Sequence, residues 1–205
     1  SFREFVIIYH EIGNELFQPR DRNGALIPLV DPLTTAYKPA GRALNYRSEP
    51  FLNRLQLQKD RFVQVDLSNA YSSYTFGDPA TPMARSYLGD PVKWRIVHGG
   101  SEVFHVHHVH GGSIRWLKQP KTEDTRFDRG LDKRPPLLTT ASTRVDSQAI
   151  GPGESYDAES ECGSGGCQQS VGDFLVHCHV AHHYLAGMWG IWRVYNTLQD
   201  GVAST

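Results

Sequence analysis

Short stretches of alternating apolar and polar residues follow one another along the chain, separated by turn residues. The cleanest alternation is in Arg61–Leu67 (RFVQVDL), and further strands are expected over Arg3–His10 (REFVIIYH), Asp90–Val97 (DPVKWRIV) and the aromatic segment Trp189–Tyr195 (WGIWRVY). Alternation with a period of two is typical of half-buried β-strands. Phe51–Lys59 alternates only loosely, and no internal repeat is visible. The pattern therefore predicts an all-β protein.

Weaker strand signals and long loops fill the rest of the chain. A further short strand is expected over Ser113–Leu117. Breakers such as Asn, Gly and Pro predict loops over residues 11–35, 37–50 and 118–136. Short strands with turn signals between them favour an antiparallel Greek-key β-barrel or sandwich.

Length, charge and hydropathy limit the classes of protein to which this chain could belong. A chain of 205 residues is long enough for one substantial domain or two small ones. The net charge of -1 and the pI near 6.8 give no indication of a nucleic-acid partner. No apolar run approaches the roughly 18 residues of a transmembrane helix. No signal peptide is visible, and a start at Ser1 is what a processed or trimmed product would show.

The three cysteines fall into two groups. Cys162 and Cys167 flank a Gly-Ser-Gly-Gly loop and are close enough to pair. We expect a disulfide there, which fits an oxidising compartment; two free surface thiols are the alternative. Cys178 stands alone and has a histidine on each side, His177 and His179.

Potential metal ligands are concentrated around Cys178. His183 follows it by five residues and Met188 by ten, within the stretch GDFLVHCHVAHHYLAGMWG. Two imidazoles, a thiolate and a weak axial thioether are the ligands of a blue copper site. Because side chains alternate along a strand, His177 and His179 should point away from the face that Cys178 occupies.

A second cluster supplies more imidazoles. Residues 104–112 read FHVHHVHGG, in which His108 and His110 should share one face of a strand, with Val109 opposite. The H-x-H pair could also be read as His105 and His107. We prefer the first reading because it leaves His105 three residues upstream for the cysteine site.

Together the two clusters resemble the C-terminal copper-binding signature of the multicopper oxidases, a group that includes laccases, ceruloplasmin-like ferroxidases and bacterial manganese oxidases. The resemblance lies in H-x-x-H-x-H followed downstream by H-C-H-x-x-x-H-x-x-x-x-M, and it is strong after about residue 75 and weak before residue 60. It implies a cupredoxin-like fold, with a type 1 copper bound by His105, Cys178, His183 and Met188. It also implies a trinuclear copper cluster whose ligands include His108, His110, His177 and His179.

The sequence departs from the family pattern in two places. Val106 stands where the family often has Pro, and His110-Gly111-Gly112 replaces the H-G-H of laccases. His107 and His182 have no role in the pattern. Asp173 and Glu102 lie near the ligands in sequence, but neither can be assigned as a hydrogen-bond acceptor for a ligand imidazole.

The resemblance implies a function and also a missing part. Family members take single electrons at the type 1 copper and pass them through the residue matching Cys178, and its two flanking histidines, to a cluster that reduces O2 to water. That cluster takes eight histidines in four pairs, and this chain supplies two pairs. We therefore expect another cupredoxin domain or subunit to supply the remaining four. Residues 1–205 would be one elaborated domain, the C-terminal part of a larger oxidase, with an irregular region over residues 1–60 and a copper-binding core over residues 61–198.

Several points stay open at this stage. The reducing substrate is a small phenol or a metal ion such as Mn(II) or Fe(II), which acidic residues at 102, 124, 128 and 132 could guide. We expect a secreted, periplasmic or cell-surface protein, with no nucleic-acid partner and no membrane span. The alternative to an oxidase is a blue-copper electron carrier without oxygen chemistry, although a carrier has no need of the pairs His108/His110 and His177/His179. A storage or structural protein that has lost catalysis is a further alternative, disfavoured by the complete ligand set.

Overall fold

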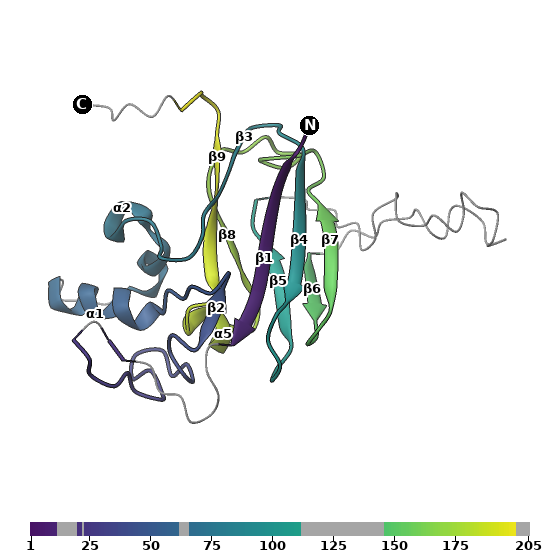
Figure 1. The fold of residues 1–205 in the computed structure, drawn as a ribbon. Coiled ribbons are helices and arrows are strands. Elements are labelled where there is room, and N and C mark those ends of the chain that lie inside the picture. Colours follow the sequence, from purple (N-terminus) through teal and green to yellow (C-terminus); the bar gives the residue numbers. More distant parts are fainter. Residues whose placement is uncertain (12–19, 22, 62–65, 112–145, 200–205) are drawn as a thin grey trace.

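Two β-sheets pack against each other, with helices gathered at one side (Figure 1). The computed structural model describes residues 1–11, 20–21, 23–61, 66–111 and 146–199. The predicted strand Ser113–Leu117, and the acidic residues at 124, 128 and 132, lie outside these ranges.

The first sheet has the order β2-β1-β4-β7. Its strands are β1 (Arg3–Glu11), β2 (Arg42–Leu44), β4 (Val92–His98) and β7 (Ser155–Glu159). Buried and half-buried side chains alternate along β4, as its sequence predicted. β1 and β4 run parallel, whereas β1 pairs antiparallel with β2 and β4 pairs antiparallel with β7.

The second sheet carries His105, His107, His108 and His177 and has the order β3-β9-β8-β5-β6. Its strands are β3 (Ala84–Tyr87), β5 (His105–Val109), β6 (Ser147–Ile150), β8 (Gly172–Cys178) and β9 (Trp189–Tyr195). β8 is central, with β5 antiparallel on one side and β9 antiparallel on the other. This places both histidine-rich segments on adjacent strands.

Buried tryptophans fill the space between the sheets. The rings of Trp94 and Trp192 meet edge to face at 5.3 Å, and both side chains are almost fully buried. Trp94 Nε1 donates to Ser160 Oγ at 3.0 Å, and Trp192 Nε1 donates to Ser86 Oγ at 2.8 Å. With their polar atoms satisfied, these large rings contribute apolar burial without an unpaired donor.

Helices cover the outer side of β9. They are α1 (Phe51–Arg61), the 3-10 helix η1 (Leu67–Tyr71), α2 (Ser73–Phe76) and the short α5 (Ala181–Leu185). A second apolar cluster joins Phe51 and Leu55 of α1 to Trp189 at the start of β9. Arg54 is buried beside them, 2.9 Å from Glu49, with its guanidinium 4.9 Å from the Trp189 ring centre.

Three sequence expectations need correction. The sheets are mixed rather than antiparallel, because β1 pairs with β4 and β3 with β9 in parallel. The loosely alternating segment that begins at Phe51 is a helix. The strand expected over Arg61–Leu67 is wrong at both ends, since Arg61 closes α1 and Leu67 opens η1, while residues 62–65 are outside the described ranges.

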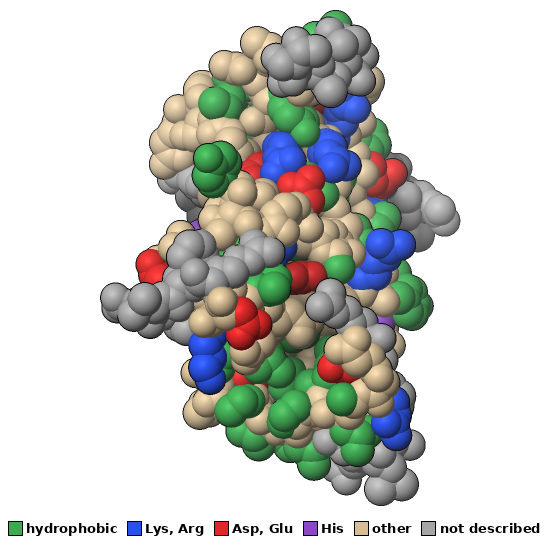
Figure 2. Space-filling model, turned by 90° about the vertical axis from the view of Figure 1, so that its left-hand side faces the viewer, with side chains coloured by type: hydrophobic (Ala, Val, Ile, Leu, Met, Phe, Trp, Pro, Cys, Tyr) green, Lys and Arg blue, Asp and Glu red, His purple; other side chains and the backbone are tan. Residues whose placement is uncertain are grey.

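Apolar side chains are also exposed on the helical side. Figure 2 shows them gathered toward the lower end of the face turned to the viewer. In the chain segment that connects β1 to α1, the exposed apolar residues include Leu26, Leu29, Val30 and Tyr37. Within the described residues, no helix combines the length and apolarity needed to cross a membrane.

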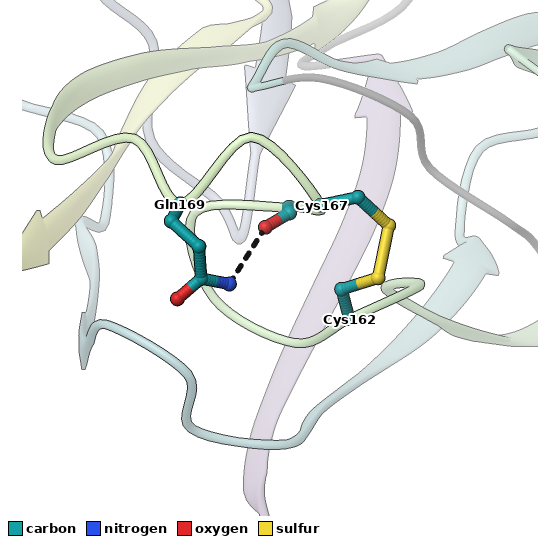
Figure 3. Close-up of a disulfide and its surroundings, with 4 residues drawn as sticks. Cys162, Cys167 and Gln169 are labelled. Atoms are coloured by element: carbon teal, nitrogen blue, oxygen red, sulfur yellow. Dashed lines mark hydrogen bonds between the residues drawn. A yellow bond between two sulfur atoms is a disulfide. The ribbon is translucent and has the colours of Figure 1, made fainter.

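The expected disulfide joins Cys162 and Cys167 (Figure 3). Its loop is tied together by further hydrogen bonds, among them one from the Gln169 side-chain amide to the Gly166 carbonyl at 3.1 Å. Ser164, within the loop, donates to Ser86 Oγ at 2.7 Å and so connects the loop to β3.

We predict that replacing both Cys162 and Cys167 with serine lowers the free energy of unfolding by about 2 kcal/mol, because the short closed loop regains its entropy in the unfolded chain. Urea denaturation of the oxidised wild-type protein and the double variant measures this difference. Equal midpoints and slopes would show that the crosslink adds nothing to stability.

Candidate metal centre

His105, Cys178 and His183 come together at one end of the second sheet. They come from the start of β5, the end of β8 and helix α5, respectively. Cys178 Sγ lies 3.4 Å from His183 Nδ1 and 3.9 Å from His105 Nδ1, and the two Nδ1 atoms are 3.2 Å apart. Three ligand atoms thus face a common point.

This arrangement fits a bound metal ion. Nitrogen and sulfur ligands at about 2.0 and 2.3 Å from one ion lie about 3.3 to 3.8 Å from each other, close to the separations found here. Among the cysteines of the described residues, Cys178 is the one that forms no disulfide, and its side chain is fully buried. A thiol with two imidazoles is a donor set that suits copper.

Burial sets the protonation of these ligands. It raises the pKa of Cys178 to about 11, so the thiol must give up a proton when it binds a metal ion. Burial also lowers the pKa of His105 to about 3 and that of His183 to about 4, so both imidazoles are neutral at pH 7 and ready to ligate.

Met188 lies in the same apolar cluster as Cys178 and is fully buried. Its backbone is fixed by two hydrogen bonds: Cys178 N–H donates to the Met188 carbonyl, and Met188 N–H donates to the His183 carbonyl, each at 3.1 Å. The axial role of its thioether stays a prediction.

A second group forms on the opposite side of β8. His108, His110 and His177 each offer a ring nitrogen, all within 4.8 Å of one another. The Nε2 atoms of His110 and His177 are 3.0 Å apart. His179 lies beside them, with its ring centre 5.0 Å from that of His108 and 5.5 Å from that of His177. His110 and His179 are exposed, so this group opens to the surface.

Backbone carbonyls orient two of these rings. His177 Nδ1 lies 2.8 Å from the Cys178 carbonyl, and His108 Nδ1 lies 2.9 Å from the Asp146 carbonyl. A carbonyl can only accept a hydrogen bond, so Nδ1 carries the proton in each ring and Nε2 keeps its lone pair. Nε2 is therefore the atom that each ring presents to a metal ion.

The histidines without a family role lie elsewhere. His107 is paired with Cys178 in the strand register, but its ring is buried against Tyr9, whose hydroxyl lies 2.6 Å from Nδ1. The alternative H-x-H reading, with His105 and His107, would therefore assign a core side chain to a copper. His182 is exposed on α5.

An acidic residue beside the candidate ligand His105 was missed from the sequence. Glu11 Oε1 lies 3.1 Å from His105 Nε2, and both side chains are buried. Asp173 instead pairs with Arg193 at 2.6 Å, and Glu102 is exposed. No sequence signal identifies Glu11, because its proximity depends on the parallel pairing of β1 with β4.

Comparisons with known proteins identify the fold. No protein-family model matches the chain, and neither does any curated protein. The chain is similar to the solved copper nitrite reductase from Nitrosomonas europaea, with a TM-score of 0.52 and 14% identity over 95% of this chain and 49% of that chain. It is also similar to the multicopper oxidase mgLAC, with a TM-score of 0.51 and 16% identity over 98% of this chain and 45% of that chain.

These likenesses show the fold alone: a cupredoxin-like β-sandwich, as the sequence predicted. The chain spans less than half the length of both structures. A copper nitrite reductase from Thermus scotoductus SA-01 also matches, with a TM-score of 0.48 and 15% identity over 93% of this chain and 30% of that chain.

We predict that the metal-free protein loses stability as the pH falls from about 6.5 toward 4. Burial holds the pKa of His107 at about 3 and that of His177 at about 4, below the usual histidine pKa of about 6.5. In this window the unfolded chain binds more protons, so each such histidine removes up to about 1.4 kcal/mol of stability per pH unit.

Urea midpoints measured at pH 7, 6 and 5 test this, with H107Q as the matched variant that removes one buried titrating ring. The slope of stability against pH should be smaller for H107Q. A wild-type midpoint that does not change between pH 7 and 5 would contradict the account.

Proposed function

We propose that this chain is a copper-binding redox domain of a multicopper oxidase. His105, Cys178 and His183, with Met188 as the axial group, hold a type 1 copper. His108, His110, His177 and His179 form half of a second, oxygen-reducing copper cluster. The close approach of the three ligand atoms around Cys178 supports the first site, and the group of three imidazoles supports the second.

One observation carries the proposal: adjacent residues of a single strand belong to different ligand groups. Cys178 faces His105 and His183, whereas His177 faces His108 and His110. The side chains of consecutive strand residues point to opposite faces, so one peptide unit joins the two sites covalently. A protein that stored copper or carried single electrons would have no use for this link.

Copper, when bound, takes up and releases one electron at a time by cycling between Cu(II) and Cu(I). The chain contributes the surroundings of the ligands. Cys178 and His105 are fully buried, which keeps water from the sulfur. Val106 N–H, 3.4 Å from Cys178 Sγ, is placed to donate to the thiolate and so stabilise its charge.

A partner completes the second cluster in this proposal. Reduction of O2 to two waters consumes four electrons and four protons, and the family cluster uses eight histidines for it. Here four are present, and two of them, His110 and His179, are exposed. We infer that another cupredoxin domain or subunit docks at this edge and supplies the other four. A protein longer than this chain agrees with the partial coverage of the solved structures.

The electron donor is inferred to be a small phenol or a metal ion such as Mn(II) or Fe(II). The disulfide between Cys162 and Cys167 supports a location outside the reducing cytosol, at the cell surface, in the periplasm or in the medium.

A second candidate is a copper reductase with a single copper on His108, His110 and His177. The observation that favours it is that His108, His110 and His177 meet within this one chain, while His179 lies outside that group of three. A solved copper nitrite reductase shares the fold. The electron carrier considered from the sequence is disfavoured by the same three histidines.

Copper-loaded variants test the assignment of the two groups. C178S should lose the intense thiolate-to-copper absorption and the type 1 EPR signal, because the sulfur ligand is gone. H108A should keep both signals and, in the assembled protein, lose O2 reduction. H182A, which changes an exposed histidine of α5 outside both groups, is the control and should behave as wild type.

A blue absorption that survives C178S, or one that disappears in H108A, would contradict the assignment. Steady turnover with nitrite rather than O2 as the electron acceptor would favour the reductase.

A further inference from the structure

A buried carboxylate lies directly behind one of the proposed copper ligands. Glu11 is the last residue of β1, and the exposed fraction of its side chain is 4%. Its Oε1 is 3.1 Å from Nε2 of His105, whose own side chain is fully buried. Within the described residues neither of these two atoms has a hydrogen-bond partner, so their contact is a close polar approach without the alignment of a full hydrogen bond. Glu11 Oε1 and His105 Nε2 therefore face each other as neighbouring polar atoms.

The backbone around Glu11 holds the carboxylate in place. Its second oxygen, Oε2, accepts a hydrogen bond from the Ser101 N–H at 3.1 Å. Position 100 is a glycine, and a Cβ there would overlap the carboxylate. The turn after β4 therefore leaves room for Glu11 and fixes the direction in which it points.

His98 closes the other side of this arrangement without acting as a ligand. Its ring stacks on that of His105, with ring centres 4.6 Å apart and an angle of 23° between the planes. Its Nε2 lies 2.7 Å from the Val103 carbonyl, and its Nδ1 accepts from the Gly100 N–H at 3.1 Å. Both ring nitrogens of His98 are occupied. Glu11, His98 and His105 are therefore poorly suited to hold a separate metal ion, although their atoms lie close together.

The geometry points to Glu11 as a positioning residue for the copper ligand His105, an inference that rests on the copper site proposed above. A carboxylate 3.1 Å from Nε2 favours the tautomer with the proton on that nitrogen. The lone pair of His105 is then on Nδ1, the atom that faces Cys178 and His183. A carboxylate behind a ligand imidazole also increases the basicity of that imidazole and adds negative charge near the ion.

Three substitutions separate this role from simple packing. E11L fills the space but removes the acceptor, E11Q keeps an acceptor oxygen but removes the charge, and G100A displaces the carboxylate without deleting it. E4Q is the matched control: Glu4 is on the same strand but is exposed and pairs with Arg95 at 2.6 Å. Thermal unfolding of each metal-free variant identifies those that are folded.

The first readout needs no copper. Long-range proton–nitrogen NMR correlations of the metal-free protein report which ring nitrogen of His105 carries the proton. We expect the Nε2–H form in wild type, E4Q and E11Q, and a mixture of forms in E11L. A His105 protonated at Nδ1 in wild type, or an unchanged form in E11L, would overturn the role of Glu11.

The second readout is copper binding, followed by the thiolate-to-copper absorption. E11L and G100A should bind Cu(II) about 10- to 100-fold more weakly than wild type. E11Q should regain most of that affinity but have a higher reduction potential, since the lost charge stabilised Cu(II) more than Cu(I). Affinity and potential equal to wild type in all three variants would refute the inference. A wild-type protein that develops no thiolate-to-copper absorption would instead refute the proposed function.

Discussion

The pairing of β8 with its two neighbours determines where every proposed copper ligand points. β5 fixes one side, with His108 opposite His177, and β9 fixes the other, with Trp189 opposite His177. Side chains alternate along the strand, so a slip of one residue would turn Cys178 toward His108 and His110, and His177 toward His105. The apolar side chains of the sandwich, above all Trp94 and Trp192, penalise such a slip because it would move buried residues of β8 to the surface.

The two ligand groups differ in exposure, and this difference suggests a division of labour. His105 and Cys178 are sealed inside the sandwich, and burial keeps the imidazole neutral and the metal-free thiol protonated. His110 and His179, by contrast, are at the surface. A site that exchanges single electrons benefits from a dry and rigid shell, whereas a site completed by a partner has to present its ligands outward. The C-terminal end of β8 contributes to both sites, through Cys178 to the buried one and through His177 to the one nearer the surface.

The sequence predicted well those features that depend on local pattern. The strands Arg3–Glu11, Val92–His98 and Trp189–Tyr195 were found because one face of each is apolar. Helix α1 was missed because its buried positions, Phe51, Arg54, Leu55 and Gln58, have helical spacing but two of them are polar. The role inferred for Glu11 could not be predicted, since it arises from a parallel strand pairing between distant segments. The ligand spacing was visible in advance; the hydrogen-bond acceptors behind the ligands were not.

Copper content and EPR of the purified wild-type chain, measured on one sample, test the central claim most directly. The account predicts one tightly bound copper per chain with the narrow hyperfine splitting of a type 1 site, and a Cys178 thiol that no longer reacts with thiol reagents. Further copper, with a type 2 signal, should appear only when the partner domain or subunit is present. A chain that binds copper through its histidines alone, shows an ordinary type 2 spectrum and leaves Cys178 free would contradict the account.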